Sequence, residues 1–232
     1  MTDAIILAGG LGTRLKRAVP DLPKPLAQVN GRPFLDLLLT QIERADEVKK
    51  VILAVGYRSE QIIEQYANCG RFSFELVFSK EDEPLGTGGA IIKASRLTRT
   101  NEILVLNGDS YVDIDIDDLI GFHRESGAPF TIVLKDADDC RRYGKVGVNN
   151  ESRVISFGEK DSAAGPGLIN AGVYVFDRAL FEDEAERNLS LETGLLPDYV
   201  RYGGYGYIVH GRFIDIGIPE TYREAQQYLR GI

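Results

Sequence analysis

The sequence predicts an α/β protein with a Rossmann-like, mostly parallel sheet flanked by helices and a second, strand-rich lobe. Two observations lead to this prediction. In the first half of the chain, short aliphatic runs that suit strands buried on both faces alternate with helical runs, which is the order that builds a parallel sheet with right-handed crossovers. In the second half, strand-like runs follow one another with few helices between them.

The first half combines aliphatic runs with segments of helical periodicity. A helix is expected over residues 33–45, where apolar residues recur at helical spacing and Pro33 suits the first helical position. Further helices are predicted over residues 59–67, with Ser59 as the cap, and over residues 88–97. The predicted strands are residues 4–8, 51–56, 74–78 and 102–109.

The second half of the chain has a different sequence pattern. Its strand-like runs are separated by turn residues, and the segment from Pro219 places Tyr222, Ala225 and Leu229 on one stripe of a closing helix. No internal repeat, low-complexity tract or linker interrupts the chain, so we expect residues 1–232 to form one domain. The predicted strands are residues 130–135, 145–148, 153–157 and 168–176, and the acidic residues Asp113, Asp115, Asp117 and Asp118 are interpreted as a polar helix start.

Composition and charge exclude several classes of function. The formal net charge is −8, whereas binding to nucleic acid or to a membrane surface needs a basic face. Cys69 and Cys140 form no CxxC pair and do not lie near His123 or His210, so neither a disulfide framework nor a zinc site is expected. The N-terminus lacks the basic region of a signal peptide, and no run approaches the roughly 20 apolar residues of a membrane span. We therefore expect a cytoplasmic protein.

A glycine-rich loop follows the first predicted strand. Gly9, Gly10 and Gly12 have no Cβ atoms, which permits positive φ and a close approach of the backbone to a ligand. Thr13 adds a hydroxyl, and Arg14 adds a planar set of donors that matches phosphate oxygens. A phosphorylated ligand is therefore expected at this loop.

Two common phosphate-binding motifs do not fit the loop. No stretch of the chain has the pattern G-x-x-x-x-G-K-[ST] of a P-loop. A dinucleotide fingerprint counted from Gly10 would need glycine where Leu15 stands, and no acidic residue ends the second predicted strand, which disfavours a dehydrogenase. A glycine turn without a ligand is disfavoured by Arg14 and by Lys24, which stands between two prolines.

Segments spread over nearly the whole chain resemble, in order, the signature of the sugar-1-phosphate nucleotidyltransferases. They are LAGGLGTRL, LPKPL, EPLGTGGA (83–90), LNGDS (106–110), YGKV (143–146), GEK (158–160), NAGVYVF (170–176) and DIGIPETY (215–222). Members of this family join a nucleoside triphosphate to a sugar 1-phosphate and release pyrophosphate. The resemblance implies a nucleotide-binding half of about residues 1–112 and a sugar-phosphate-binding half of about residues 113–232.

The resemblance also implies which residues carry the reaction. The sugar phosphate is itself a nucleophile, because the second pKa of a phosphate monoester lies near ~6. Positioning and electrostatics, rather than a general base, therefore have to carry catalysis. By resemblance, Arg14, Lys24 and Asp109 are catalytic, and Asp109 with Asp215 binds Mg²⁺, whose preference is for oxygen ligands.

Two sets of binding residues complete this prediction. Nucleotide-binding roles are implied for Leu7, Ala8, Gly9, Gly10, Gly12, Thr13, Arg14, Lys24, Gly86, Thr87, Gly88 and Gly108. Contacts to the sugar 1-phosphate are implied for Gly144, Glu159, Lys160, Asn170, Gly172 and Glu192.

The identity of the substrates stays open at this stage. Within the family, the short chain and the forms LGTGGAI and LNGDS most resemble enzymes that transfer a guanylyl group from GTP to D-glycero-α-D-manno-heptose 1-phosphate, which makes this pair of substrates the expectation. Uridylyl, thymidylyl or cytidylyl transfer to a hexose or amino-sugar 1-phosphate would use the same residues. A non-catalytic sensor of sugar nucleotides is the alternative from another class, and the 10 Phe and 11 Tyr residues are compatible with a homodimer.

Overall fold

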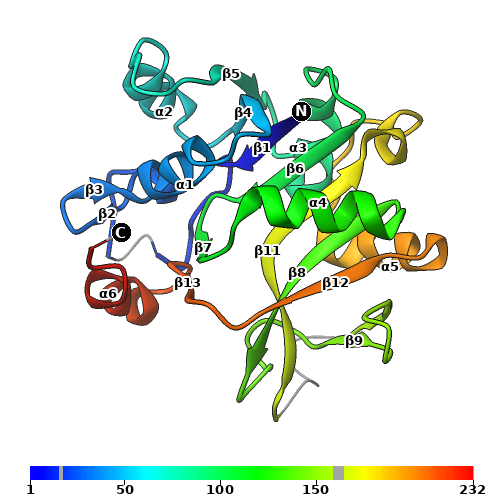
Figure 1. Cartoon of the computed structure of the whole chain (residues 1–232). Coiled ribbons are helices and arrows are strands. Elements are labelled where there is room, and N and C mark those ends of the chain that lie inside the picture. The colour runs from blue at the N-terminus through cyan, green and yellow to red at the C-terminus, as the bar shows by residue number, and fades with distance from the viewer. Residues whose placement is uncertain (16–17, 159–164, 232) are drawn as a thin grey trace.

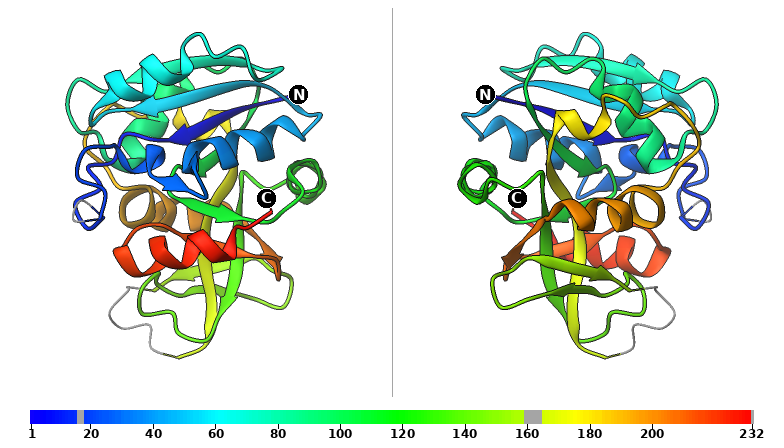
Figure 2. Two further views of the ribbon diagram at one scale, coloured as in Figure 1. Left: turned by 90° about the vertical axis from the view of Figure 1, so that its left-hand side faces the viewer. Right: turned by 90° about the vertical axis from the view of Figure 1, so that its right-hand side faces the viewer.

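A computed structural model describes residues 1–15, 18–158 and 165–231 of the chain. Helices cover both faces of a central sheet, and two long strands, β8 (Phe130–Ala137) and β11 (Gly167–Asp177), run from this layered region into a second lobe (Figure 1). The two side views in Figure 2 show the sheet enclosed between the helical layers, with the C-terminus beside the last helix. The predicted α/β fold class is confirmed.

Nine strands within the described residues form one sheet, in the order β10-β9-β11-β6-β1-β4-β5, with β8 paired to β11 and β12 paired to β8. The strands of the first half are parallel, whereas β11 runs antiparallel to β6, β8 and β9. The remaining bounds are β1 (Thr2–Leu7), β4 (Val48–Val55), β5 (Glu75–Lys80), β6 (Glu102–Asn107), β9 (Val146–Val148), β10 (Val154–Phe157) and β12 (Tyr205–Val209).

The two main clusters of the core lie one on each face of the sheet, because successive residues of a strand point to opposite faces. Ala4 and Ile6 of β1 belong to one cluster, and Ile5 belongs to the other. The first cluster includes α1 (Phe34–Glu43), α2 (Ser59–Tyr66), α4 (Ile116–Ser126) and α6 (Pro219–Tyr228). The second includes α3 (Gly86–Ser95), α5 (Leu196–Tyr199) and the short turns η3 (Arg178–Phe181) and η4 (Leu191–Leu195).

Most predicted elements occur within a few residues of their expected bounds, but one cap is wrong. Ser59 is the first residue of α2, and the cap is Arg58, which has a left-handed backbone with φ 52° and makes no side-chain capping hydrogen bond. The amide of Ser59 instead donates to the carbonyl of Gly56 at 3.1 Å. The turn at Gly56, rather than a serine hydroxyl, therefore begins this helix.

Two short antiparallel pairs did not show in the sequence pattern. One joins β2 (Gln28–Val29) to β3 (Arg32–Pro33), and the other joins β7 (Ser110–Val112) to β13 (Phe213–Asp215). In the second pair Asp215 lies opposite Ser110. A segment near the C-terminus is thereby fixed directly beside the end of β6.

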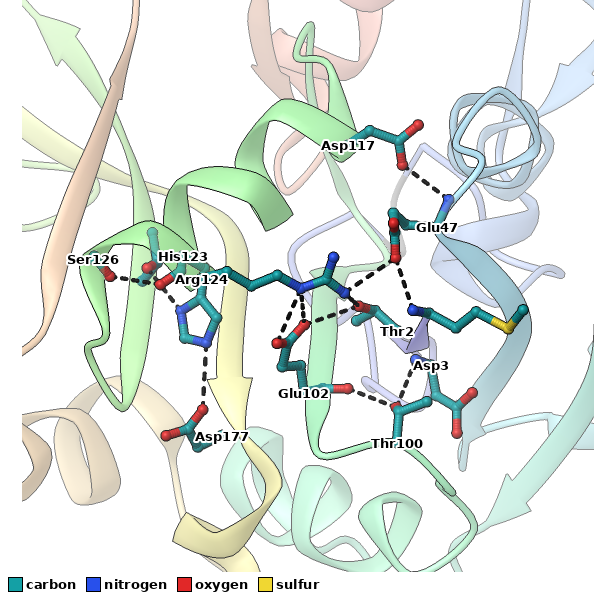
Figure 3. A network of polar contacts seen from close by, with 12 residues as sticks. Thr2, Asp3, Glu47, Thr100, Glu102, Asp117, His123, Arg124, Ser126 and Asp177 are labelled. Carbon is teal, nitrogen blue, oxygen red and sulfur yellow. Dashed lines mark hydrogen bonds and ion pairs between the residues drawn. The ribbon is translucent and has the colours of Figure 1, made fainter.

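A polar network links the amino ends of the parallel strands (Figure 3). This edge of the sheet is opposite to the carboxyl ends of β1 and β6. The guanidinium of Arg124 in α4 contacts the carboxylates of Glu102 at 2.9 Å and Glu47 at 3.1 Å. Glu47 also pairs with the N-terminal ammonium of Met1 at 2.8 Å.

None of the helices in the described residues has the length and apolar character that crossing a membrane requires.

His123 lies beside this network and is only 3% exposed. Its Nδ1 lies 3.0 Å from the hydroxyl oxygen of Thr131, and its Nε2 lies 3.5 Å from the carboxylate of Asp177 (Figure 3). Burial lowers the pKa of His123 below its ordinary 6.5, against the opposing charges of Asp177 and Glu102.

This burial predicts a pH dependence of stability. As the pH falls through 6.5, the unfolded chain takes up a proton at residue 123 before the native state does, so the free energy of unfolding falls as the pH drops. Urea titrations from about pH 7.5 to about pH 5.5 should show a smaller fall for His123→Asn than for the parent chain. Equal falls in the two proteins would show that His123 does not titrate in this way.

Two helical glycines give a matched test of close packing. A Cβ atom at Gly89 of α3 would overlap the carbonyl oxygen of Arg187, whereas a Cβ atom at Gly121 of α4 meets nothing within 4 Å. Gly89→Ala should therefore lower the free energy of unfolding by about 1–3 kcal/mol. Gly121→Ala should raise it by about 0.5–1 kcal/mol, because alanine favours helix more than glycine does. Thermal denaturation of both variants tests the difference.

Candidate active site

A cleft lies at the carboxyl ends of β1 and β6, the edge where open α/β sheets bind ligands. It has a charged compartment of about 310 Å³, whose walls include Arg14, Lys24, Asp109, Arg142 and Asp215. It also has an apolar compartment of about 540 Å³, whose walls include Leu11, Tyr57, Glu81, Pro84 and Ala90. Leu7, Gly10, Gly12 and Thr87 line both, so the two compartments adjoin along the glycine loop.

The glycine loop is held close to other parts of the protein as well as facing the cleft. A Cβ atom at Gly9 would lie 2.5 Å from Oε1 of Glu81 and 3.0 Å from the amide nitrogen of Gly56. Gly12 has a left-handed backbone with φ 58°, which favours glycine. The absence of a side chain at Gly9 therefore makes room for the carboxyl group of Glu81, a protein neighbour that the sequence did not suggest.

Lys24 and Asp109 form an ion pair across the charged compartment. Lys24 begins the short turn η1 (Lys24–Leu26), and Pro23 and Pro25 restrict the backbone on both sides of it. Its Nζ donates to Oδ2 of Asp109, which follows the end of β6. The side chain of Lys24 is 11% exposed and that of Asp109 is 34% exposed. The cation is therefore held in the wall, and the carboxylate remains accessible from the cleft.

Asp215 is surrounded by hydrogen-bond donors. Its Oδ1 accepts from the guanidinium of Arg142 at 2.5 Å and from the backbone amide of Gly217 at 2.6 Å. Its Oδ2 accepts from the hydroxyl of Tyr143 at 2.6 Å. Burial and this contact with Asp215 raise the pKa of Tyr143, so the phenol remains a donor at neutral pH.

Thr87 and Glu192 join the two halves of the chain at the cleft. The hydroxyl of Thr87 donates to Oε2 of Glu192 at 3.0 Å and accepts from the amide of Leu191 at 2.8 Å. Ser190 donates to the same oxygen of Glu192 at 3.1 Å. These two bonds fix the position of the Glu192 carboxylate, which lies in the wall of the charged compartment.

The structure brings most of the sequence-predicted residues into this cleft. Four do not line either compartment: Ala8, Gly88, Gly144 and Gly172. The amide of Gly88 is already bonded to the carbonyl of Leu189 at 2.8 Å. Glu159 and Lys160 lie outside the described residues. Those in the walls are Leu7, Gly9, Gly10, Gly12, Thr13, Arg14, Lys24, Gly86, Thr87, Gly108, Asp109, Asn170, Glu192 and Asp215.

Sequence reasoning missed several residues of the walls. Arg142 and Tyr143 hold Asp215, and Tyr143 opens a segment that carried the family resemblance, so its position in the motif was a usable signal. Glu81 follows β5 and gave no signal, because a single acid in an acidic stretch does not stand out. Asn107 also lines the charged compartment, and its buried Oδ1 is without a hydrogen-bond partner within the described residues.

The two carboxylates offer oxygen ligands for a divalent cation. Asp215 is the last residue of β13 and pairs with Ser110 of β7, and the amide of Ile216 donates to the carbonyl of Asp109 at 2.8 Å, so the two aspartates are neighbours. Each carboxylate is paired with a protein cation, Lys24 for Asp109 and Arg142 for Asp215. Two protein carboxylates completed by substrate phosphates and water suit magnesium, so the residues fit such an ion.

Comparison with known proteins agrees with this geometry. Residues 3–230 match the family model described as nucleotidyl transferase, and the chain belongs to this family. The nucleotidyltransferase class expected from the sequence is confirmed. Nucleotidyltransferases of this family generally need a divalent metal ion.

Three relatives illustrate the similarity. The chain is 40% identical, over 98% of both chains, to D-glycero-α-D-manno-heptose 1-phosphate guanylyltransferase of Aneurinibacillus thermoaerophilus. It is also 40% identical to the enzyme of that name from Campylobacter jejuni, over 95% of this chain and 96% of the relative. The crystal structure of HddC from Yersinia pseudotuberculosis complexed with GMP-PN superposes with a TM-score of 0.86 and 36% identity, covering 98% of this chain and 99% of that one.

Removal of the Lys24 charge tests the charged compartment. Lys24→Met keeps the length of the side chain but removes the cation, and we expect the initial rate of pyrophosphate release to fall by about 100-fold or more. Folding should survive, because Asp109 is partly exposed and water can solvate its freed carboxylate. The exposed Lys49 provides a control, and Lys49→Met should retain the parent rate. Equal rates for the two variants would remove Lys24 from the catalytic residues.

Proposed function

We propose that this protein transfers a guanylyl group from GTP to D-glycero-α-D-manno-heptose 1-phosphate and releases pyrophosphate. The names of its 40% identical relatives support this pair of substrates. The observation that carries the choice of nucleotide is the carboxylate of Glu81 in the wall of the apolar compartment.

Glu81 is placed to accept hydrogen bonds from a base. Its Oε2 accepts from the amide of Leu85 at 2.9 Å, and its Oε1 lies beside Gly9. Burial raises the pKa of this carboxyl, while the Leu85 amide and the charge of Lys93 act in the opposite direction. The net pKa shift is upward, and in the ionised form both oxygens of this carboxylate are acceptors.

A carboxylate selects guanine among the bases. Guanine presents two adjacent donors, N1–H and the N2 amino group, which match the two oxygens of a carboxylate. Adenine and cytosine present a donor next to an acceptor, and uracil and thymine present a single donor between two acceptors. An acceptor of the base would meet a carboxylate oxygen without a proton between them, and this is costly inside a cleft. Leu11, Tyr57 and Pro84 supply apolar surface for the faces of the ring.

The charged compartment supplies the means for the transfer itself. The phosphate of the sugar attacks the α-phosphate of the nucleotide, and charge spreads over the departing pyrophosphate. Arg14 and Lys24 place positive charge where these oxygens gather, and the amides of the glycine loop add neutral donors. We propose that Asp109 and Asp215 hold Mg²⁺, which when bound neutralises charge on the phosphates and keeps their oxygens aligned.

The sugar would lie against the side of this compartment that the second half supplies. Asn170 and Glu192 line it, and Gly144, Gly172, Glu159 and Lys160 remain proposed contacts of the sugar 1-phosphate. The two halves share one sheet through the pairing of β6 with β11, which supports our proposal of a single catalytic domain. We also propose that the enzyme is located in the cytoplasm, where GTP is available. We further propose that it forms a homodimer, since the exposed side chains of Tyr202 and Tyr228 suit an interface.

Inosine triphosphate tests the role of Glu81, because its base differs from guanine by the missing N2 amino group. The parent enzyme should prefer GTP by about 10-fold or more in kcat/KM, the value of one hydrogen bond to a charged group. In Glu81→Gln this preference should nearly disappear. Asp82→Asn removes a carboxylate that is 90% exposed on the same wall and should keep it. A parent enzyme that uses UTP, dTTP or CTP better than GTP would contradict the proposed function.

A further inference from the structure

Arg142 neutralises the more buried of the two aspartates in the charged compartment. Its Nη2 donates to Oδ1 of Asp215 at 2.5 Å and to the hydroxyl of Thr221 at 3.2 Å. The guanidinium carbon lies 5.1 Å from the ring centre of Tyr143. The side chain is nonetheless 27% exposed and lines the compartment, so it is a cation at the surface of the cleft and not a buried structural residue.

This contact competes with a divalent ion for Asp215. Oδ1 already accepts from Arg142 and from the amide of Gly217, which uses both of its lone pairs. The other two donors on this carboxylate, the Gly217 amide and the Tyr143 hydroxyl, are neutral. A guanidinium on the same carboxylate as a divalent ion would repel the ion at short range. A divalent ion therefore binds Asp215 most tightly when Arg142 has moved away from the carboxylate.

The displaced guanidinium has a partner close by. Arg142 lines the same compartment as Arg14, Lys24 and Asp109, where the phosphates of both substrates have to meet. A guanidinium matches two phosphate oxygens at once, and such paired charge-assisted bonds are among the stronger contacts in proteins. The sugar phosphate, which carries the nucleophilic oxygen, enters from the side of the second half, to which Arg142 belongs.

We propose that Arg142 is the resident counter-ion of Asp215, and that it transfers to the phosphate of the sugar 1-phosphate when a divalent ion binds. Arg142 then couples the binding of the divalent ion to the binding of the sugar 1-phosphate. The ion frees the guanidinium for the phosphate, and the phosphate draws the guanidinium away from Asp215, so each ligand strengthens the binding of the other by the same factor. This inference rests on the proposed function, because it assumes an ion at Asp215 and a phosphate in the charged compartment.

Binding of Mn²⁺ to the enzyme without substrates gives the first test. Free Mn²⁺ is followed by electron paramagnetic resonance, and the site of interest is the one that Asp215→Asn abolishes. Arg142→Gln should bind Mn²⁺ about 10-fold more tightly than the parent, because the competing cation is gone. Arg142→Lys keeps a cation and should stay near the parent affinity. Arg141→Gln is the matched control, since the exposed Arg141 pairs with Asp139 and should not affect the site.

Calorimetry of the sugar phosphate gives the second test. D-glycero-α-D-manno-heptose 1-phosphate is titrated without GTP, so no reaction takes place. In the parent enzyme Mn²⁺ should tighten its binding by about 5-fold or more. In Arg142→Gln binding should be weaker, and the tightening by Mn²⁺ should shrink toward the part that direct contact of phosphate with the ion contributes. Near-parent melting temperatures confirm that the variants are folded.

The outcomes separate the inference from the function on which it rests. If Arg142→Gln binds Mn²⁺ at the parent affinity or more weakly, Arg142 is not a competing counter-ion and the inference is wrong, while the proposed function stands. If the coupling between Mn²⁺ and the sugar phosphate is unchanged in Arg142→Gln, the transfer to phosphate is wrong. If the parent enzyme binds no Mn²⁺ that depends on Asp215, even with GTP present, the proposed metal site fails together with the inference.

Discussion

The cleft depends on pairs of opposite charges that are assembled from distant parts of the chain. Lys24 pairs with Asp109, and Arg142 pairs with Asp215. Four like-charged groups in one compartment would repel one another, whereas alternating charges hold the site together before any substrate arrives. The fold positions three of these four residues by separate features: a proline-flanked turn for Lys24, the exit of β6 for Asp109, and the pairing of β7 with β13 for Asp215.

The glycines of the family motifs divide into two physical roles. Gly10 and Gly12 line both compartments and leave the backbone open to a ligand. Gly9 and Gly89 have no side chains because protein atoms occupy that space, the Glu81 carboxylate in one case and the Arg187 carbonyl in the other. A glycine-rich motif thus indicates close approach, and only the structure tells whether a ligand or another segment is the neighbour.

The sequence was sufficient for the strands and helices of the first half, because aliphatic runs and helical spacing are local signals. The family motifs also singled out Lys24, Asp109 and Asp215, which the structure brings together in the charged compartment. It could not reveal the pairing of β7 with β13, since such short strands carry no periodicity and their contact spans about a hundred residues. It missed Arg142 because its partner, Asp215, is distant in the sequence, and it missed Glu81 because one acid in an acidic stretch gives no signal.

Asp109, Asp215 and Glu81 each have a hydrogen-bond or ion-pair partner in the cleft that offsets the negative charge. An uncompensated carboxylate would repel a triphosphate, yet Asp109, Asp215 and Glu81 all face the cleft. The two aspartates hold side-chain cations, and at Asp215 we propose that a divalent ion replaces the guanidinium of Arg142, which then pairs with a phosphate. Glu81 is held by a backbone amide, a partner that cannot leave, and it lies in the compartment that a base can fill while the phosphates occupy the other. In the proposed function, an exchangeable partner thus lies at Asp215, where charge is rearranged during transfer, and a fixed partner lies at Glu81, where recognition of the base stays constant.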